Sequence, residues 1–178
     1  MSARMFDGAR RWYWLAGTGL ALTGIAVFAL WPRAEEQPRA RQYRDVSACL
    51  LTDSTGIASA EVKPVWAGMQ DASLATLGQV RFLSIAGPQD VANGRTFVNT
   101  LVLGKCAVIV AAGKLPVETI TTVARESPNQ TFVVVVPGGS PPSPGTGNVS
   151  VISAAGDDAT RDAVRTTITQ SLSASPNA

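Results

Sequence analysis

The sequence contains no histidine, so it lacks the side chain that most often serves as a general base or a metal ligand. It has only three lysines, and no glycine-rich stretch is followed by the Lys-Ser/Thr pair of a phosphate-binding loop. A serine nucleophile would therefore need one of those lysines as its base. No catalytic set can be read from the chain, so we expect a protein that is not an enzyme and that needs no cofactor.

Cysteine and clustered positive charge are also scarce. Two cysteines are too few for a four-thiolate zinc site, and we expect no metal centre. Residues 1–44 have a balance of +4 and residues 45–178 a balance of −2, within a net charge of +2. The larger part of the chain carries no basic stripe that would neutralise phosphates, and nucleic acid is therefore excluded as a partner.

One long hydrophobic run, from Trp12 to Trp31, carries no charged residue. At about 1.5 Å per residue it matches the roughly 30 Å hydrocarbon core of a bilayer, and the aromatic residues at its ends suit the two interfaces. We predict a single transmembrane helix at 12–31, after a short segment 1–11. A cleaved signal peptide with Arg10 and Arg11 as its basic region is the alternative. Close to the run, Arg10 and Arg11 outweigh the single Arg33 and favour a cytoplasmic N-terminus, whereas lysines and arginines counted over both flanks do not decide the orientation.

Charge and apolar content divide the rest of the chain into three parts. Residues 32–44 are charged and poor in apolar side chains, which indicates a solvated linker. Residues 45–172 are predicted to form the folded domain, and residues 173–178 a disordered tail.

Five apolar runs of strand length alternate with helix-length segments over this domain, at 46–51, 80–85, 106–111, 131–136 and 149–152. The third and fourth runs are almost continuously apolar, as strands buried on both faces of a parallel sheet require. The pattern predicts an α/β fold: a five-stranded parallel sheet in the flavodoxin-like order 2-1-3-4-5 with flanking helices. Residues 140–148 are rich in proline and glycine and predict a loop where a helix would otherwise join the last two strands.

Helical spacing of apolar residues predicts which helix faces are buried. Asp90 is the expected N-cap of the second helix, and Asp157 or Asp158 that of the fourth. The residues expected to face the core are Val62, Trp66, Met69 and Ser73, then Val117, Ile120, Val123 and Ala124, then Val164, Ile168 and Leu172.

The two cysteines, Cys49 and Cys106, fall in the first and third runs, which are neighbours in the predicted strand order. Outside the cytoplasm they can form a disulfide if their α-carbons lie within about 7 Å. Two small buried thiols in adjacent strands are the alternative.

Four stretches of this sequence, ACLLTDSTGI, VWAGMQDA, KCAVIVAAG and VARESPNQTFVVV, together resemble the first lobe of the basic membrane protein family. Members are solute-binding proteins of ABC transporters with a type I periplasmic-binding fold, and purine nucleosides are among their ligands. The resemblance covers about residues 46–153, and it implies that the domain lies outside the cytoplasm, at the cell membrane. The chain has ASAEVK at 58–63, where the family places acidic and amide groups of its ligand site, and it lacks the family's lipoprotein cysteine.

Candidate ligand-binding residues follow from the rule that open parallel sheets bind ligands beyond the carboxyl ends of their strands, near the switch between strands one and three. Asp53 can accept hydrogen bonds from a ribose or an amine, and exposed backbone amides at the glycine positions can donate them. Ordinary turn chemistry is the alternative, because Asp, Ser and Gly dominate strand-to-helix turns. The full set is Asp53, Ser54, Thr55, Gly56, Gly87, Gly113, Lys114, Gly138 and Gly139.

Two functional hypotheses follow. The first is a membrane-anchored, extracytoplasmic solute-binding-like domain that binds a nucleoside or another small solute, with a transporter or other membrane protein as its partner. The second is a scaffold that kept the fold, lost the ligand and acts through protein partners.

Overall fold

The computed structural model describes residues 42–138, 147–154 and 156–175, which belong to one compact unit, Gln42–Ala178. The predicted helix at 12–31, the candidate Gly139 and most of the predicted loop at 140–148 lie outside the described residues. Among the described residues, no helix has both the length and the apolar character needed to span a bilayer.

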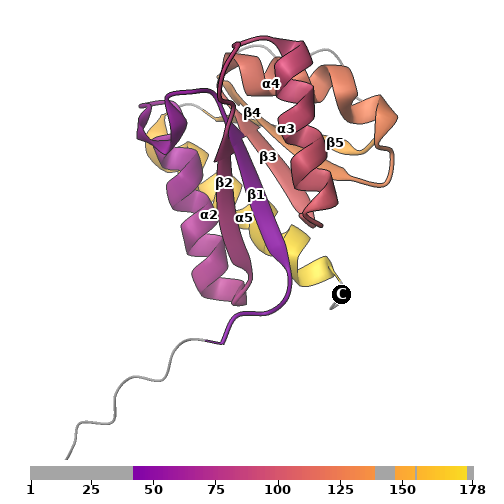
Figure 1. The fold of residues 1–178 in the computed structure, drawn as a ribbon. Helices are drawn as coiled ribbons and strands as arrows, with labels where there is room; N and C mark the ends of the chain where they lie inside the picture. The colour runs from indigo at the N-terminus through magenta and orange to yellow at the C-terminus, as the bar shows by residue number, and fades with distance from the viewer. Residues whose placement is uncertain (1–41, 139–146, 155, 176–178) are drawn as a thin grey trace, which may run out of the picture. The chain divides into compact units, whose positions relative to one another are not determined.

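Five strands form one parallel sheet in the order β2-β1-β3-β4-β5, which confirms the predicted topology (Figure 1). Their bounds are β1 (Ser47–Thr52), β2 (Gln79–Ser84), β3 (Val108–Ala112), β4 (Thr131–Pro137) and β5 (Val149–Ala154). Strands β1 and β3 are buried along their whole length because both faces of the central sheet are covered. This double burial is the physical reason for their near-continuous apolar sequences.

The helices cover the two faces of the sheet in pairs (Figure 1). Helices α2 (Lys63–Thr76) and α5 (Asp157–Ala174) pack on one face, and α3 (Val91–Leu103) and α4 (Lys114–Val123) on the other. Short 3₁₀ helices, η1 (Gly56–Ala58) and η2 (Ala124–Glu126), complete the set. Successive side chains of β1 point to opposite faces of the sheet. Leu50 therefore packs in the core formed with α2 and α5, and Leu51 in the core formed with α3 and α4.

The predicted core faces of the helices are buried, with two partial exceptions. Val117 is half-buried, and so is Trp66, whose ring meets that of Phe82 edge to face at a centroid distance of 5.6 Å. The prediction for α3 is also confirmed at its start: the Asp90 carboxylate caps the helix by accepting a hydrogen bond from the backbone N–H of Asn93 at 2.8 Å.

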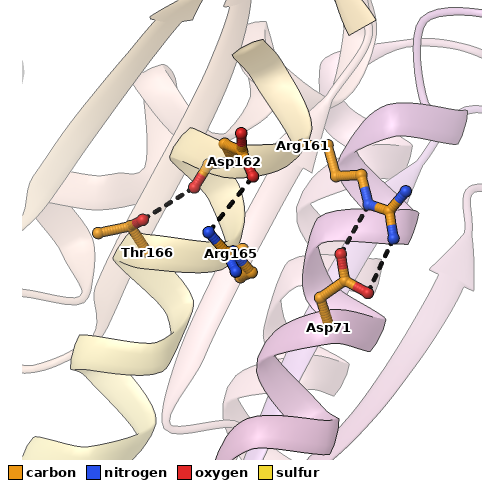
Figure 2. Close-up of polar contacts among 5 residues, drawn as sticks. All are labelled: Asp71, Arg161, Asp162, Arg165 and Thr166. Atoms are coloured by element: carbon orange, nitrogen blue, oxygen red, sulfur yellow. Dashed lines mark hydrogen bonds and ion pairs between the residues drawn. The ribbon is translucent and has the colours of Figure 1, made fainter. Parts of the chain in front are cut away.

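Charged side chains join α2 to α5 at the protein surface. Arg161 donates two hydrogen bonds to the Asp71 carboxylate, at 2.6 Å from Nε and 3.0 Å from Nη2 (Figure 2). This guanidinium lowers the pKa of Asp71 below its ordinary value of 3.8. On α5 itself, Arg165 lies 3.4 Å from the Asp162 carboxylate, and the Thr166 hydroxyl donates to the Asp162 carbonyl at 2.9 Å (Figure 2).

Strand β3 and helix α5 begin differently from the prediction. Strand β3 starts at Val108 rather than at Cys106, because the backbone N–H of Cys106 still bonds the Leu101 carbonyl at the end of α3. The N-cap of α5 is Gly156, so the assignment of Asp157 or Asp158 was wrong; both lie in the first helical turn.

The domain also extends slightly beyond both predicted ends. Arg44, which the prediction placed in the linker, donates its backbone N–H to the Leu77 carbonyl at 2.7 Å and accepts a hydrogen bond from Gln79 Nε2 at 3.5 Å. At the other end, α5 continues two residues past the predicted limit of 172, to Ala174.

Cys49 and Cys106 are bonded in the structure, with their α-carbons 5.9 Å apart, and both residues are buried. The disulfide ties β1 to the residues that lead into β3. Arg81 lies across the bond from the neighbouring strand, with Nη2 3.8 Å from each sulfur.

Candidate functional site

The carboxyl ends of the strands and the starts of the helices that follow them meet at one edge of the sheet, as the parallel topology requires. Two cavities lie at this edge. The larger has a volume of about 470 Å³ and lies between the end of β4 and the first turns of α4. It is lined by Glu61, Gly113, Lys114, Val117, Glu118, Thr121, Thr122, Val135, Val136 and Pro137.

The smaller cavity has a volume of about 270 Å³ and lies between the end of β4 and the starts of α2 and α5. It shares Glu61 and the last three residues of β4 with the larger cavity. Its own lining residues are Pro64, Ala112, Gly138, Gly156, Asp157 and Thr160.

Glu61 is the one charged residue that lines both cavities. It is exposed, and it immediately precedes Val62, the N-cap of α2. Among the described residues its carboxylate has no hydrogen-bond or ion-pair partner. Sequence reasoning did not select this residue, because ASAEVK departs from the family's pattern of acidic and amide groups, although the resemblance placed residues 58–63 at the family's ligand site.

Three of the predicted site residues line these cavities. Gly113 and Lys114, at the start of α4, line the larger one, and Gly138, after β4, lines the smaller one. Lys114 is exposed, and like Glu61 it makes no ion pair within the described part of the chain.

Other predicted residues gather beside the cavities, at the ends of β1 and β2. The Asp53 carboxylate accepts hydrogen bonds from the backbone N–H of Thr55 at 2.9 Å and from its hydroxyl. The Ser54 N–H donates to Gln89 Oε1 at 3.2 Å, and Gln89 Nε2 donates to the Gly87 carbonyl at 3.1 Å. These contacts hold the two turns together, and none of these residues lines either cavity.

Asp53 nevertheless lies near one residue of the larger cavity's lining. A Cβ on Gly113 would lie 3.8 Å from Asp53 Oδ2, so one carboxylate oxygen is directed toward a residue of the lining. Gly56 has a packing role instead: it is buried, its φ is 65°, and a Cβ there would lie 3.3 Å from Ser84 Oγ.

The two glycines that line the cavities at helix starts share one backbone conformation. Gly113 has φ 93° and ψ 159°, and Gly156 has φ 90° and ψ 163°, each as the N-cap of its helix. This region of conformational space is essentially restricted to glycine. The strand-to-helix turns that shape both cavities therefore depend on glycine at these positions.

The lining of the larger cavity combines apolar and charged side chains. Val117, Val135, Val136 and Pro137 supply the walls of the larger cavity. Among the described residues, no three His, Cys, Asp or Glu side chains are grouped closely enough to hold a metal ion. The arrangement suits an organic ligand with an apolar body, because specific small-molecule sites combine apolar walls with a few polar groups.

Comparisons with known proteins show the fold and leave the family open. No family model matches the chain, and no curated protein matches it. Among solved structures, the chain is similar to a "putative lipoprotein from Peptoclostridium difficile 630 (fragment)", with 15% identity, a TM-score of 0.59 and coverage of 71% of this chain and 98% of that one. This likeness shows a shared fold, and the basic membrane protein family itself is not shown.

Two further solved structures match with lower scores. A solute-binding protein of an ABC transporter system from Aeropyrum pernix K1 has 21% identity and a TM-score of 0.49, with 60% of this chain and 28% of that chain covered. The LpoA C-domain from Haemophilus influenzae, a regulator of PBP1A, has 10% identity and a TM-score of 0.45, with 72% and 48% covered.

Proposed function

We propose that the protein is a non-catalytic, extracytoplasmic solute-binding-like domain, anchored in the cell membrane by residues 12–31, that takes a small solute at the carboxyl edge of its sheet. The observation that carries this proposal is the pair of cavities that meet at Glu61. They lie where open parallel sheets bind ligands, beyond the carboxyl ends of the strands.

The size and lining of the larger cavity support the proposal. Its volume of about 470 Å³ falls within the range of small-molecule pockets, roughly 300–1,000 Å³. Valine and proline side chains supply apolar surface in its lining, together with carboxylate, ammonium and hydroxyl groups. A nucleoside-like solute suits this lining, since its base can pack on the apolar wall while Glu61 or Asp53 accepts hydrogen bonds from its hydroxyl groups.

The partner is the second element of the proposal. The resemblance of residues 46–153 to the first lobe of a two-lobed solute-binding protein implies that a second surface completes the site. We assign that surface to a membrane protein of ABC-type transport, because the proposed anchor would hold the domain beside such a protein.

A thermal-shift screen of the full chain in detergent against nucleosides, purine bases and small sugars tests the proposal. A ligand at about one hundred times its dissociation constant adds roughly 2.7 kcal/mol of stability, enough to raise the melting temperature by several degrees. The Thr122→Trp variant should lose the shift, because Thr122 is exposed and lines the larger cavity.

The matched control is Thr100→Trp. Thr100 is also exposed and on a helix, and its hydroxyl donates to the carbonyl four residues earlier at 2.9 Å, as that of Thr122 does, yet it lines neither cavity. The control should keep the full shift. A chain that melts cooperatively and responds to no compound would refute solute binding and leave the scaffold hypothesis as the account of this protein.

A further inference from the structure

The charged residues that line the larger cavity are two glutamates and one lysine, so the lining has a net negative charge. Glu61, Glu118 and Lys114 line it, and none of the three forms an ion pair among the described residues. Lys114 and Glu118 lie one turn apart on α4, and their opposite charges balance in the net charge of the lining. Glu61 has no such counterpart in the lining.

The neighbouring helix ends do not remove this imbalance. The N-terminus of α5 carries a partial positive charge of about half a unit, but Asp157 and Asp158 in its first turn offset it. The N-terminus of α4 adds a similar partial charge beside Lys114. Lys63, two residues after Glu61, is exposed and lines neither cavity. The negative charge of Glu61 is therefore larger than the partial positive charge of the α4 N-terminus.

The position of Glu61 relative to the apolar walls defines the shape of a complementary ligand. Glu61 lines the larger cavity together with Val135 and Val136, and it also lines the smaller cavity. A molecule with its apolar body against the β4 and α4 walls would thus meet the carboxylate at one end.

We propose that the ligand carries a positively charged amine, paired with Glu61, on an apolar body that occupies the cavity between β4 and α4. This inference rests on the proposed function and specifies the chemical class of its solute. A divalent metal is a poorer occupant, because the described part of the chain holds no group of three potential metal ligands.

A series of three compounds with one body and different end groups tests the charge directly. The probes are 3-phenylpropylamine, 3-phenylpropan-1-ol and 3-phenylpropanoate, titrated into the ¹⁵N-labelled full chain in zwitterionic detergent. Backbone amide shifts at Lys114, Val117 and Val136 report binding in the cavity independently of any partitioning into micelles. We expect the amine to bind about fivefold more tightly than the alcohol, the effect of one partly exposed charge pair, and the carboxylate to bind most weakly.

Two variants of opposite charge change separate the role of Glu61 from general electrostatics. Glu61→Gln should bring the affinity for the amine down to that for the alcohol, whereas Lys114→Gln should raise the affinity for the amine. Equal or tighter binding of the alcohol or the carboxylate at these amides would overturn the ligand class and leave the solute site standing. No shift at any cavity amide with any of the three compounds would overturn both.

Discussion

The backbone of Gly68 passes so close to that of Arg161 that a Cβ on Gly68 would lie 2.5 Å from the Arg161 carbonyl oxygen. The same Cβ would lie 3.0 Å from the Cβ of Val164. Helices α2 and α5 can therefore reach their observed separation only because position 68 has no side chain. The same two helices carry Pro64 and Thr160, which line the smaller cavity.

Replacing Gly68 with alanine should destabilise the domain by about 1–3 kcal/mol, since the clash is with backbone and cannot be relieved by a rotamer change. Thermal unfolding of the full chain measures the effect. Gly147→Ala is the matched control, because nothing lies within 4 Å of a Cβ built there, and it should leave the melting temperature nearly unchanged. Equal melting temperatures for the two variants would show that α2 and α5 are less tightly packed than described.

Alanine at Gly156 should also be destabilising, for a different reason. A Cβ there would meet no atom within 4 Å, so the cost arises from the backbone, whose φ is 90°. Strain in this region is worth about 1–3 kcal/mol. The same thermal measurement applies, and Gly113→Ala, with φ 93°, should lose a similar amount. If Gly156→Ala had the same melting temperature as the wild type, the turn would have an alternative conformation that other residues can adopt.

Asp71→Asn should lower stability at pH 7 by a small amount that disappears in acid. The hydrogen bonds from Arg161 depress the pKa of Asp71 in the folded state, so the contribution is fully present above about pH 4, the unfolded pKa, and is lost as the pH falls through the folded pKa. Melting curves of both proteins between pH 2 and pH 7 should converge at the acid end. A difference that stays constant over this range would mean that the charge of Asp71 contributes nothing.

The Cys49–Cys106 disulfide should contribute about 4 kcal/mol through the unfolded state, because it closes a loop with a sequence separation of 57 residues. Reduction under partly denaturing conditions, followed by a melting curve, tests this value. The Cys49→Ala/Cys106→Ala double variant is the control, and reductant should leave its melting temperature unchanged. If the melting temperature of the wild-type protein were the same with and without reductant, the bond would be either absent or inaccessible in solution.

Much of the fold could be predicted because its signals are local or periodic. The uninterrupted apolar run from Phe132 to Val135 marks a strand buried on both faces, and it is β4 of the central sheet. The spacing of Val164, Ile168 and Leu172 identified the face of α5 that is buried against the sheet and α2. Asp90 was predicted as an N-cap from its position just before a helix, and the structure confirms it.

Element boundaries were harder, since competing hydrogen bonds decide them. Cys106 is as apolar as the strand that follows it, but its N–H is bound at the end of α3. At α5, both Gly156 and Asp157 are residue types that favour helix starts. Gly156 has a non-helical backbone with φ 90° and is the N-cap, and Asp157 is the first helical residue.

The candidate site shows the same division between local and long-range information. Topology predicted that Gly113, Lys114 and Gly138 lie at the carboxyl edge of the sheet, and all three line the cavities there. Glu61 was not among the candidates, although the resemblance placed residues 58–63 at the family's ligand site. Its place in both cavities depends on three segments that are distant in sequence: the turn before α2, the end of β4 and the start of α4. Asp53 was proposed as a hydrogen-bond acceptor for a ligand, yet part of its hydrogen-bonding capacity is taken up by Thr55 in its own turn.

The central claim is that small organic molecules bind at the carboxyl edge of the sheet, and a fragment screen by ¹⁵N-correlation spectroscopy of the full chain tests it most directly. The account predicts that binding fragments shift the amides of Gly113, Lys114, Val136 and Gly138, and that Thr122→Trp removes the shifts at the larger cavity while Thr100→Trp preserves them. Fragments that bind only elsewhere on the domain, or a library with no hits on a folded protein, would contradict it.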